Sequence, residues 1–306
     1  MRTISCAVAA IALSCLAGSA RADDAMTIAF ANPLPAYPVW AEADQCFNKA
    51  IADAGVKGLT SGPTGLQVDN QFVLDRISQY VATGAKGIIL VPIDGPMYEP
   101  LMKEAKAKGI FVATLNTGDT TKTQDVELGT DYGNQGKVVA ENIAKREGPQ
   151  NVLILGNQPT GVHRVFVDGF SAAIKDMPNV KLVGEGYDQG DPSQTTDVVS
   201  RLLTGHPEAN VVLSWEGNSV SGIVTAIKEK GLVGKVVGVV NDITPEVVAG
   251  LKEGTLYGTS KQNFCGMAEG AVKNIIALSK GETVPKNIDT GITFVTMDNL
   301  AKESAQ

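Results

Sequence analysis

The chain alternates between short apolar runs and longer amphipathic segments from Thr27 almost to its C-terminal end. The runs are rich in Val, Ile and Leu, whereas the segments between them repeat apolar residues at helical spacing. This alternation predicts βαβ units, in which helices join parallel strands. Ten runs predict strands: TIAFA, VKGLTS, GIILVPI, IFVATLN, VELGT, NVLILGN, VKLVGEG, NVVLSWE, KVVGVVN and LYGTSKQ.

Most of these runs are continuously apolar, which indicates sheets covered by helices on both faces. Asp69, Asp131 and Asp191 each precede an amphipathic segment and are candidate helix N-caps. Ten strands are many for one open sheet, and the series divides near Thr130. The sequence therefore predicts an α/β fold with two doubly wound parallel-sheet lobes of five strands each.

No low-complexity linker marks the division between the lobes. We therefore expect the chain to cross between them near Thr130, Gln262 and Gly291, so that TGITFVT returns to the second lobe. The predicted lobes are 23–130 with 263–291, and 131–262 with 292–306. Three crossings side by side would form a hinge.

Residues 1–22 have the pattern of a secretory signal peptide. Arg2 precedes an apolar run from Ile4 to Leu16, and the small residues Ala20 and Ala22 precede the expected cleavage. The run is shorter than the roughly 20 residues that span a bilayer. A lipid anchor at Cys15 is the alternative, but the residues before it fit such a signal poorly. We expect a cleaved, exported protein.

The charge balance is acidic, with 26 basic and 33 acidic residues. Loss of Arg2 and Arg21 with the signal would leave 24 basic residues, which disfavours nucleic acid and anionic membranes as partners. The exported chain would keep Cys46 and Cys265. A disulfide and two free thiols both remain open for this pair.

The usual catalytic motifs do not occur in the sequence. It contains no glycine-rich phosphate loop, no G-x-S-x-G elbow, no clustered Cys/His set and only two histidines. We therefore predict a protein that is not an enzyme and that has no cofactor, metal site or catalytic residue.

Several segments resemble the periplasmic sugar-binding proteins of the ribose-binding type. They are GIILVPIDGPMYEPLMKEAKAKGIFVATLNTG, DYGNQGKVVAENI, LLTGHPEANVVLSWEGNSVSGIVTAIKEKG and TSKQ. The resemblance implies a monomeric periplasmic protein of the type I binding fold. Such a protein closes its lobes on a small neutral carbohydrate or polyol and delivers it to the membrane subunits of an ABC transporter. SGPTGLQVDNQFVLDRI is similar to the branch that includes rhamnose and autoinducer-2 binders, so a receptor for a furanosyl or other sensory signal is the alternative.

The resemblance also implies ligand-binding residues at strand ends and crossings. In the first lobe, Tyr37 and Trp40 open the first helix, where an aromatic face would cover a sugar ring. Asn116 and Thr117 follow the fourth strand and would bond hydroxyl groups. Gln262 matches a family glutamine at the second crossing.

In the second lobe the match is less regular. The family's arginine position holds Phe166 here, and the nearby Arg164 either reaches the cleft or lies on a solvated helix face. Glu216 would accept bonds from two hydroxyls or pair with a cationic group. Asn241 and Asp242 both fit the family's acidic position after the ninth strand. Trp215 would either form a second wall or pack in the core.

Overall fold

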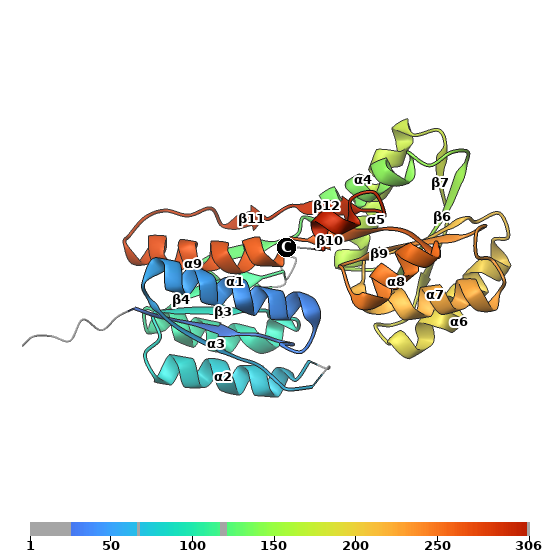
Figure 1. Ribbon diagram of the computed structural model, residues 1–306. Helices are drawn as coiled ribbons and strands as arrows, with labels where there is room; N and C mark the ends of the chain where they lie inside the picture. The colour runs from blue at the N-terminus through green and yellow to red at the C-terminus, as the bar shows by residue number, and fades with distance from the viewer. Residues whose placement is uncertain (1–25, 66–67, 117–120, 305–306) are drawn as a thin grey trace, which may run out of the picture.

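The computed structural model describes residues 26–65, 68–116 and 121–304. It consists of two α/β lobes that lie side by side (Figure 1). The predicted signal peptide and the predicted ligand residue Thr117 lie outside the described residues. Among the described residues, no helix has the length and apolar character needed to cross a membrane.

The sheet of the first lobe has six parallel strands. In spatial order they are β11 (Asn287–Asp289), β5 (Val126–Gly129), β4 (Phe111–Leu115), β3 (Gly87–Leu90), β1 (Thr27–Ala31) and β2 (Lys57–Ser61). Four helices cover it: α1 (Pro38–Ala54), α2 (Asn70–Ala82), α3 (Gly95–Ala107) and α9 (Phe264–Ser279).

The sheet of the second lobe also has six strands. In spatial order they are β12 (Ile292–Val295), β10 (Leu256–Gln262), β9 (Val237–Asn241), β8 (Val211–Ser214), β6 (Gln150–Gly156) and β7 (Val180–Tyr187). Only β12 is antiparallel to its neighbour among the described pairs. The helices are α4 (Tyr132–Ile143), α5 (Val162–Ala173), α6 (Pro192–Gly205), α7 (Val220–Glu229), α8 (Pro245–Glu253) and α10 (Leu300–Glu303), with 3₁₀ turns at Ile174–Asp176 and Gly217–Ser219.

The predicted fold class is confirmed, and the predicted strand count is corrected. All ten predicted runs form strands, but each sheet gains a sixth strand from the last crossing. Within TGITFVT, β12 pairs with β10 of the second sheet. β11 was not predicted, because NID has no apolar run and lies at the sheet edge.

Each sheet buries apolar side chains on both faces, as the continuous runs predicted. In β1, Ile28 and Phe30 pack toward α1 and α9, whereas Ala29 and Ala31 pack toward α2 and α3. This division follows from the two-residue repeat of a strand. The second sheet likewise separates a core under α6, α7 and α8 from a core under α4 and α5.

Three predicted caps fix where helices begin. The Asp69, Asp131 and Asp191 carboxylates accept hydrogen bonds from the backbone N–H groups of Phe72, Asn134 and Ser193. These N–H groups have no partner inside the helix, so each aspartate stabilises its helix start.

The chain passes between the sheets three times: from β5 to α4, from β10 to α9, and from β11 to β12. The predicted lobe boundaries fall in these three connections. The Thr130 hydroxyl donates to Gln262 Oε1 at 2.7 Å, which joins the first two crossings. The third crossing turns at Gly291, whose φ of 77° is left-handed and suits glycine.

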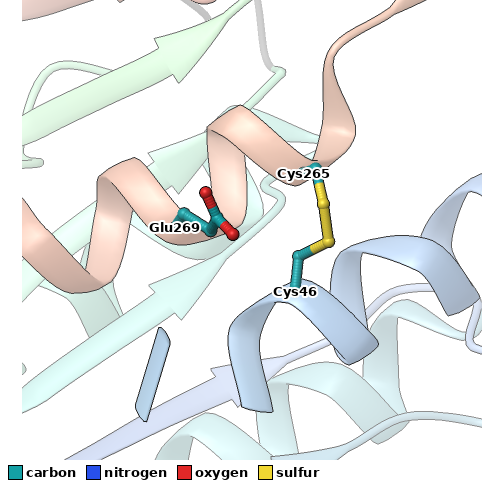
Figure 2. A group of neighbouring side chains, drawn as sticks. All are labelled: Cys46, Cys265 and Glu269. Atoms are coloured by element: carbon teal, nitrogen blue, oxygen red, sulfur yellow. A yellow bond between two sulfur atoms is a disulfide. The ribbon is translucent and has the colours of Figure 1, made fainter. Parts of the chain in front are cut away.

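Cys46 and Cys265 form a disulfide between α1 and α9, with 5.2 Å between their Cα atoms (Figure 2). The structure thereby resolves the two alternatives that the sequence left open. Glu269 lies beside the sulfur atoms and completes the one group of three potential metal ligands found among the described residues. Because both sulfurs are bonded to each other, neither offers the thiolate that a metal would need.

Candidate functional site

A cavity of about 750 Å³ lies between the two lobes. Its walls come from the first helix start and from loops after strands of both sheets, including those after β3, β4, β8 and β9. Carboxyl ends of parallel strands are where open α/β sheets bind ligands. A second hollow, of about 480 Å³, lies between α1 and α9 of the first lobe alone, away from these strand ends. We therefore take the interlobe cavity as the candidate site.

The structure brings seven of the nine predicted ligand residues to this cavity. They are Tyr37, Trp40, Asn116, Glu216, Asn241, Asp242 and Gln262. Their shared location agrees with the prediction, and their contact with a ligand stays a prediction. The eighth, Thr117, lies outside the described residues.

Arg164 is not among the described residues that line the cavity. It lies on α5, where its Nε donates to Asp168 Oδ1 at 2.9 Å and Nη1 is 3.9 Å from Glu185 Oε1. Its side chain is 42% exposed. This position matches the interpretation of Arg164 as a solvated helix residue, so the structure gives its ligand role no support.

Trp40 forms one wall of the cavity with Phe264. Their ring centroids lie 4.8 Å apart in an edge-to-face contact, which joins the starts of α1 and α9. The loop before α1 is held by Asn32, a fully buried residue that accepts from the Leu34 N–H and donates to the Trp40 carbonyl. Pro38 has no backbone N–H, so it leaves no unpaired donor at the start of α1.

Tyr132 and Trp215 form an aromatic wall on the second lobe, with centroids 5.6 Å apart. The Trp215 indole donates to His163 Nδ1 at 3.1 Å, and His163 Nε2 is 3.2 Å from Glu185. Burial lowers the pKa of His163, which favours the neutral ring that can accept this bond. Trp215 therefore lines the cavity, and His163 fixes its orientation.

Asn116 and Asp242 occupy equivalent places, each directly after the fourth strand of its lobe. Both have left-handed backbones, with φ of 51° and 65°. Asparagine and aspartate tolerate this conformation better than most residues. It turns the chain sharply at the strand end, where both residues line the cavity.

A chain of hydrogen bonds runs from the first crossing into the cavity. Thr130 donates to Gln262 Oε1, and Gln262 Nε2 donates to Asp242 Oδ1 at 3.0 Å. On the same lobe, Gln135 Nε2 donates to Asn241 Oδ1 at 2.8 Å. Asn116 Oδ1 accepts from the Tyr132 hydroxyl at 3.2 Å, so a first-lobe residue also contacts the second lobe.

The carboxylates of the cavity lie in an environment that disfavours their charge. Burial and, as the smaller cause, the nearby charge of Asp188 raise the pKa of Glu216 to about 8. Burial likewise raises the pKa of Asp242 to about 7, although its bond from Gln262 acts in the opposite direction. The pKa of Tyr37 is raised by burial and then by Asp242. The ionisable side chains that line the described wall are therefore acidic groups and tyrosines whose charged forms are disfavoured.

Sequence reasoning missed Tyr132 and Phe264 as cavity residues. Each begins the helix that directly follows a crossing, and each is aromatic. An aromatic residue at a helix start beside a predicted crossing was the available signal. Asn218, two residues after Glu216, lines the cavity as well.

Two lobes with parallel sheets, three crossings and a cavity between strand ends define a two-lobed binding protein. The chain belongs to the periplasmic binding protein family, because the periplasmic binding protein domain matches residues 28–283. This family consists of binding proteins.

Named relatives cover most of the chain. It is 24% identical to the galactofuranose-binding protein of Escherichia coli over 273 residues, which is 85% of each chain. It is also 24% identical to the D-ribose/D-allose-binding protein of Pseudomonas aeruginosa over 234 residues, 74% of this chain and 73% of that one.

Solved structures share the whole architecture. A carbohydrate-transporter solute-binding protein from Agrobacterium radiobacter, in complex with D-arabinose, is 25% identical with a TM-score of 0.75, covering 93% of this chain and 98% of that one. A glucose-galactose-binding protein from Geobacillus stearothermophilus is 22% identical with a TM-score of 0.79, over 90% and 99%.

Proposed function

We propose that this protein is the solute-binding component of an ABC transporter and that it binds a small carbohydrate or polyol between its lobes. The observation that carries the proposal is the interlobe cavity, in which aromatic walls from both lobes face amide and carboxylate groups at strand ends. Aromatic faces suit the C–H side of a sugar ring, and the polar groups suit its hydroxyls. The relatives named above bind sugars, which supports the same class of ligand.

The proposed mechanism is hinge closure. Ligand contacts from both lobes stabilise the closed form, which the membrane subunits of the transporter then recognise. A ligand must favour closure by about 5 kcal/mol to shift the protein from mostly open to mostly closed. A handful of buried hydrogen bonds, at about 1 kcal/mol each, together with aromatic burial would supply this. Gln262 is placed to couple the two events, because it bonds both Thr130 at the crossing and Asp242 in the cavity.

The proposal includes an exported, monomeric protein without enzymatic activity. Residues 1–22 would direct it to the periplasm and then be removed. The disulfide between Cys46 and Cys265 supports an oxidising compartment, since such bonds form and persist there.

Thermal unfolding of the purified protein with a panel of sugars tests the proposal. The panel contains D-arabinose, D-allose, D-ribose, D-galactose, xylitol, aminated sugars and autoinducer-2. A micromolar binder at millimolar concentration should add about 4 kcal/mol of stability. Small-angle scattering should then show a smaller radius of gyration with that ligand, and chromatography should recover the ligand unchanged.

Three results would contradict parts of this proposal. If no sugar or polyol raises the unfolding temperature, the ligand class is wrong. If a ligand binds but the radius does not change, hinge closure is wrong. If the sugar is converted to a product, the protein is an enzyme. Binding of autoinducer-2 alone would favour the sensory alternative.

A further inference from the structure

The interlobe cavity contains two carboxyl groups and no basic partner for them. Glu216 and Asp242 line it, whereas no Lys, Arg or His occurs among the described residues of its wall. The two internal stretches outside the described residues, 66–67 and 117–120, have no basic residue in their sequence either. A positive charge in this cavity would therefore have to come from the ligand.

Glu216 has an unused hydrogen-bonding atom. Its Oε2 is buried and has no hydrogen-bond partner among the described residues. The charged group that acts on it most is Asp188, which has the same sign. A buried acceptor without a partner is destabilising, and more so when it is charged. A donor on the ligand would remove this cost.

Asp242 presents its second oxygen to the same part of the cavity. Oδ1 accepts from Gln262, which leaves Oδ2 directed toward Gly217, the neighbour of Glu216. A Cβ on Gly217 would lie 2.8 Å from Asp242 Oδ2 and 2.9 Å from the Tyr37 hydroxyl. Because glycine has no Cβ, the Tyr37 hydroxyl of the first lobe can come close to residue 217 of the second lobe.

The cavity walls favour an organic cation over a metal ion. Five aromatic residues line them: Tyr37, Trp40, Tyr132, Trp215 and Phe264. The negative face of an aromatic ring attracts a cation within about 6 Å. Among the described residues, no group of three potential metal ligands lies in this cavity.

We propose that the cavity selects a solute with a protonated amine as well as hydroxyl groups, such as an aminated sugar or aminated cyclitol, over its neutral parent. The inference rests on the proposed function and narrows its ligand class, replacing the neutral solute expected from the sequence. The ammonium group pairs with Glu216 and Asp242, and the amides of Asn116 and Asn218 bond hydroxyls. An amino acid fits less well, because its carboxylate finds no basic side chain in the described wall.

Calorimetric titration with matched pairs at pH 7 tests this inference. The pairs are D-glucosamine with D-glucose, D-galactosamine with D-galactose, and an aminodeoxy-inositol with inositol. At least one amine should bind tenfold or more tightly than its parent. Its N-acetyl derivative keeps the nitrogen but not the charge, and should lose that advantage.

Glu216→Gln keeps the shape of the side chain and removes its charge. It should reduce the preference for the amine by about tenfold or more, since a charge-assisted hydrogen bond is replaced by a weaker neutral one. Glu141→Gln is the matched control, because Glu141 lies on α4 beside Lys137 and outside the cavity. It should leave the preference unchanged.

The outcomes separate this inference from the proposed function. If neutral parents bind as tightly as their amines, the inference is overturned while the carbohydrate-binding function stands. If the N-acetyl derivative binds as tightly as the amine, the positive charge does not contribute to binding and the inference is overturned. If no carbohydrate, aminated or neutral, binds at all, the proposed function fails and the inference fails with it.

Discussion

The ligand-free protein should lose stability as the pH rises from about 5 to 8, and Glu216→Gln should remove much of this loss. Burial and the charge of Asp188 raise the pKa of Glu216 from 4.5 to about 8. Between these values the folded protein keeps a proton that the unfolded chain has released. This contribution to stability is complete below pH 4.5 and is lost as the pH rises through 8.

The size of the effect follows from the shift. At about 1.4 kcal/mol per pKa unit, a shift from 4.5 to about 8 corresponds to an upper value of roughly 5 kcal/mol. Water entry and small movements of the lobes would reduce this, so we expect about 2–4 kcal/mol between pH 5 and 9. Asp242 contributes in the same direction but is present in both proteins. The difference between wild type and variant therefore isolates Glu216.

Urea denaturation followed by circular dichroism at pH 5, 6, 7, 8 and 9 measures this difference. The wild type should lose more stability than Glu216→Gln over this range, and the variant should be the more stable protein at pH 9. Glu141→Gln should follow the wild type, because Glu141 is exposed. Parallel curves for wild type and Glu216→Gln would refute the argument that the cavity disfavours a charged carboxylate.

Three further predictions address the cavity wall, the disulfide and the closed form. Trp40→Ala should weaken binding of the ligand found in the screen at least tenfold by calorimetry while the protein stays folded; unchanged affinity would exclude Trp40 as a wall. Replacing Cys46 and Cys265 by Ser should lower the free energy of unfolding by about 3–5 kcal/mol in urea, since the bridge spans 219 residues of sequence. An unchanged midpoint would show that the bridge adds nothing to stability. Gly217→Ala places a Cβ 2.9 Å from the Tyr37 hydroxyl of the first lobe, so the radius measured by scattering should no longer decrease with ligand. A normal decrease would contradict the proposed contact.

The strands were predictable because their signal is local. All ten predicted runs are strands, and the inner ones, such as β1, β3 and β8, are continuously apolar because helices cover both faces of the sheet. The caps Asp69, Asp131 and Asp191 were predictable for the same reason, as each cap bonds an N–H two or three residues further along. β11 carries no such pattern, because its pairing with β5 depends on where the third crossing passes.

The position of the site was predictable from topology, whereas the orientation of single side chains was not. Residues that end parallel strands meet at one edge, so Asn116, Glu216 and Asp242 were expected to lie together. Arg164 was expected from its place in the sequence alone. Its partner Glu185 lies in β7, about 20 residues further along the chain, and the sequence near Arg164 does not predict that contact.

The cost of the two cavity carboxylates is the strongest indication of what the cleft binds. A cavity for an uncharged polyol would gain similar hydroxyl contacts from a glutamine at position 216 and would avoid burying an ionisable carboxyl group. The structure instead combines Glu216 with Asp242 and supplies no basic side chain in the described wall. Because Gln262 bonds both Asp242 and the Thr130 crossing, a cation at Asp242 would act directly on the hinge. Charge on the ligand would thereby contribute to closure as well as to affinity, which a neutral sugar of the same shape would do less well.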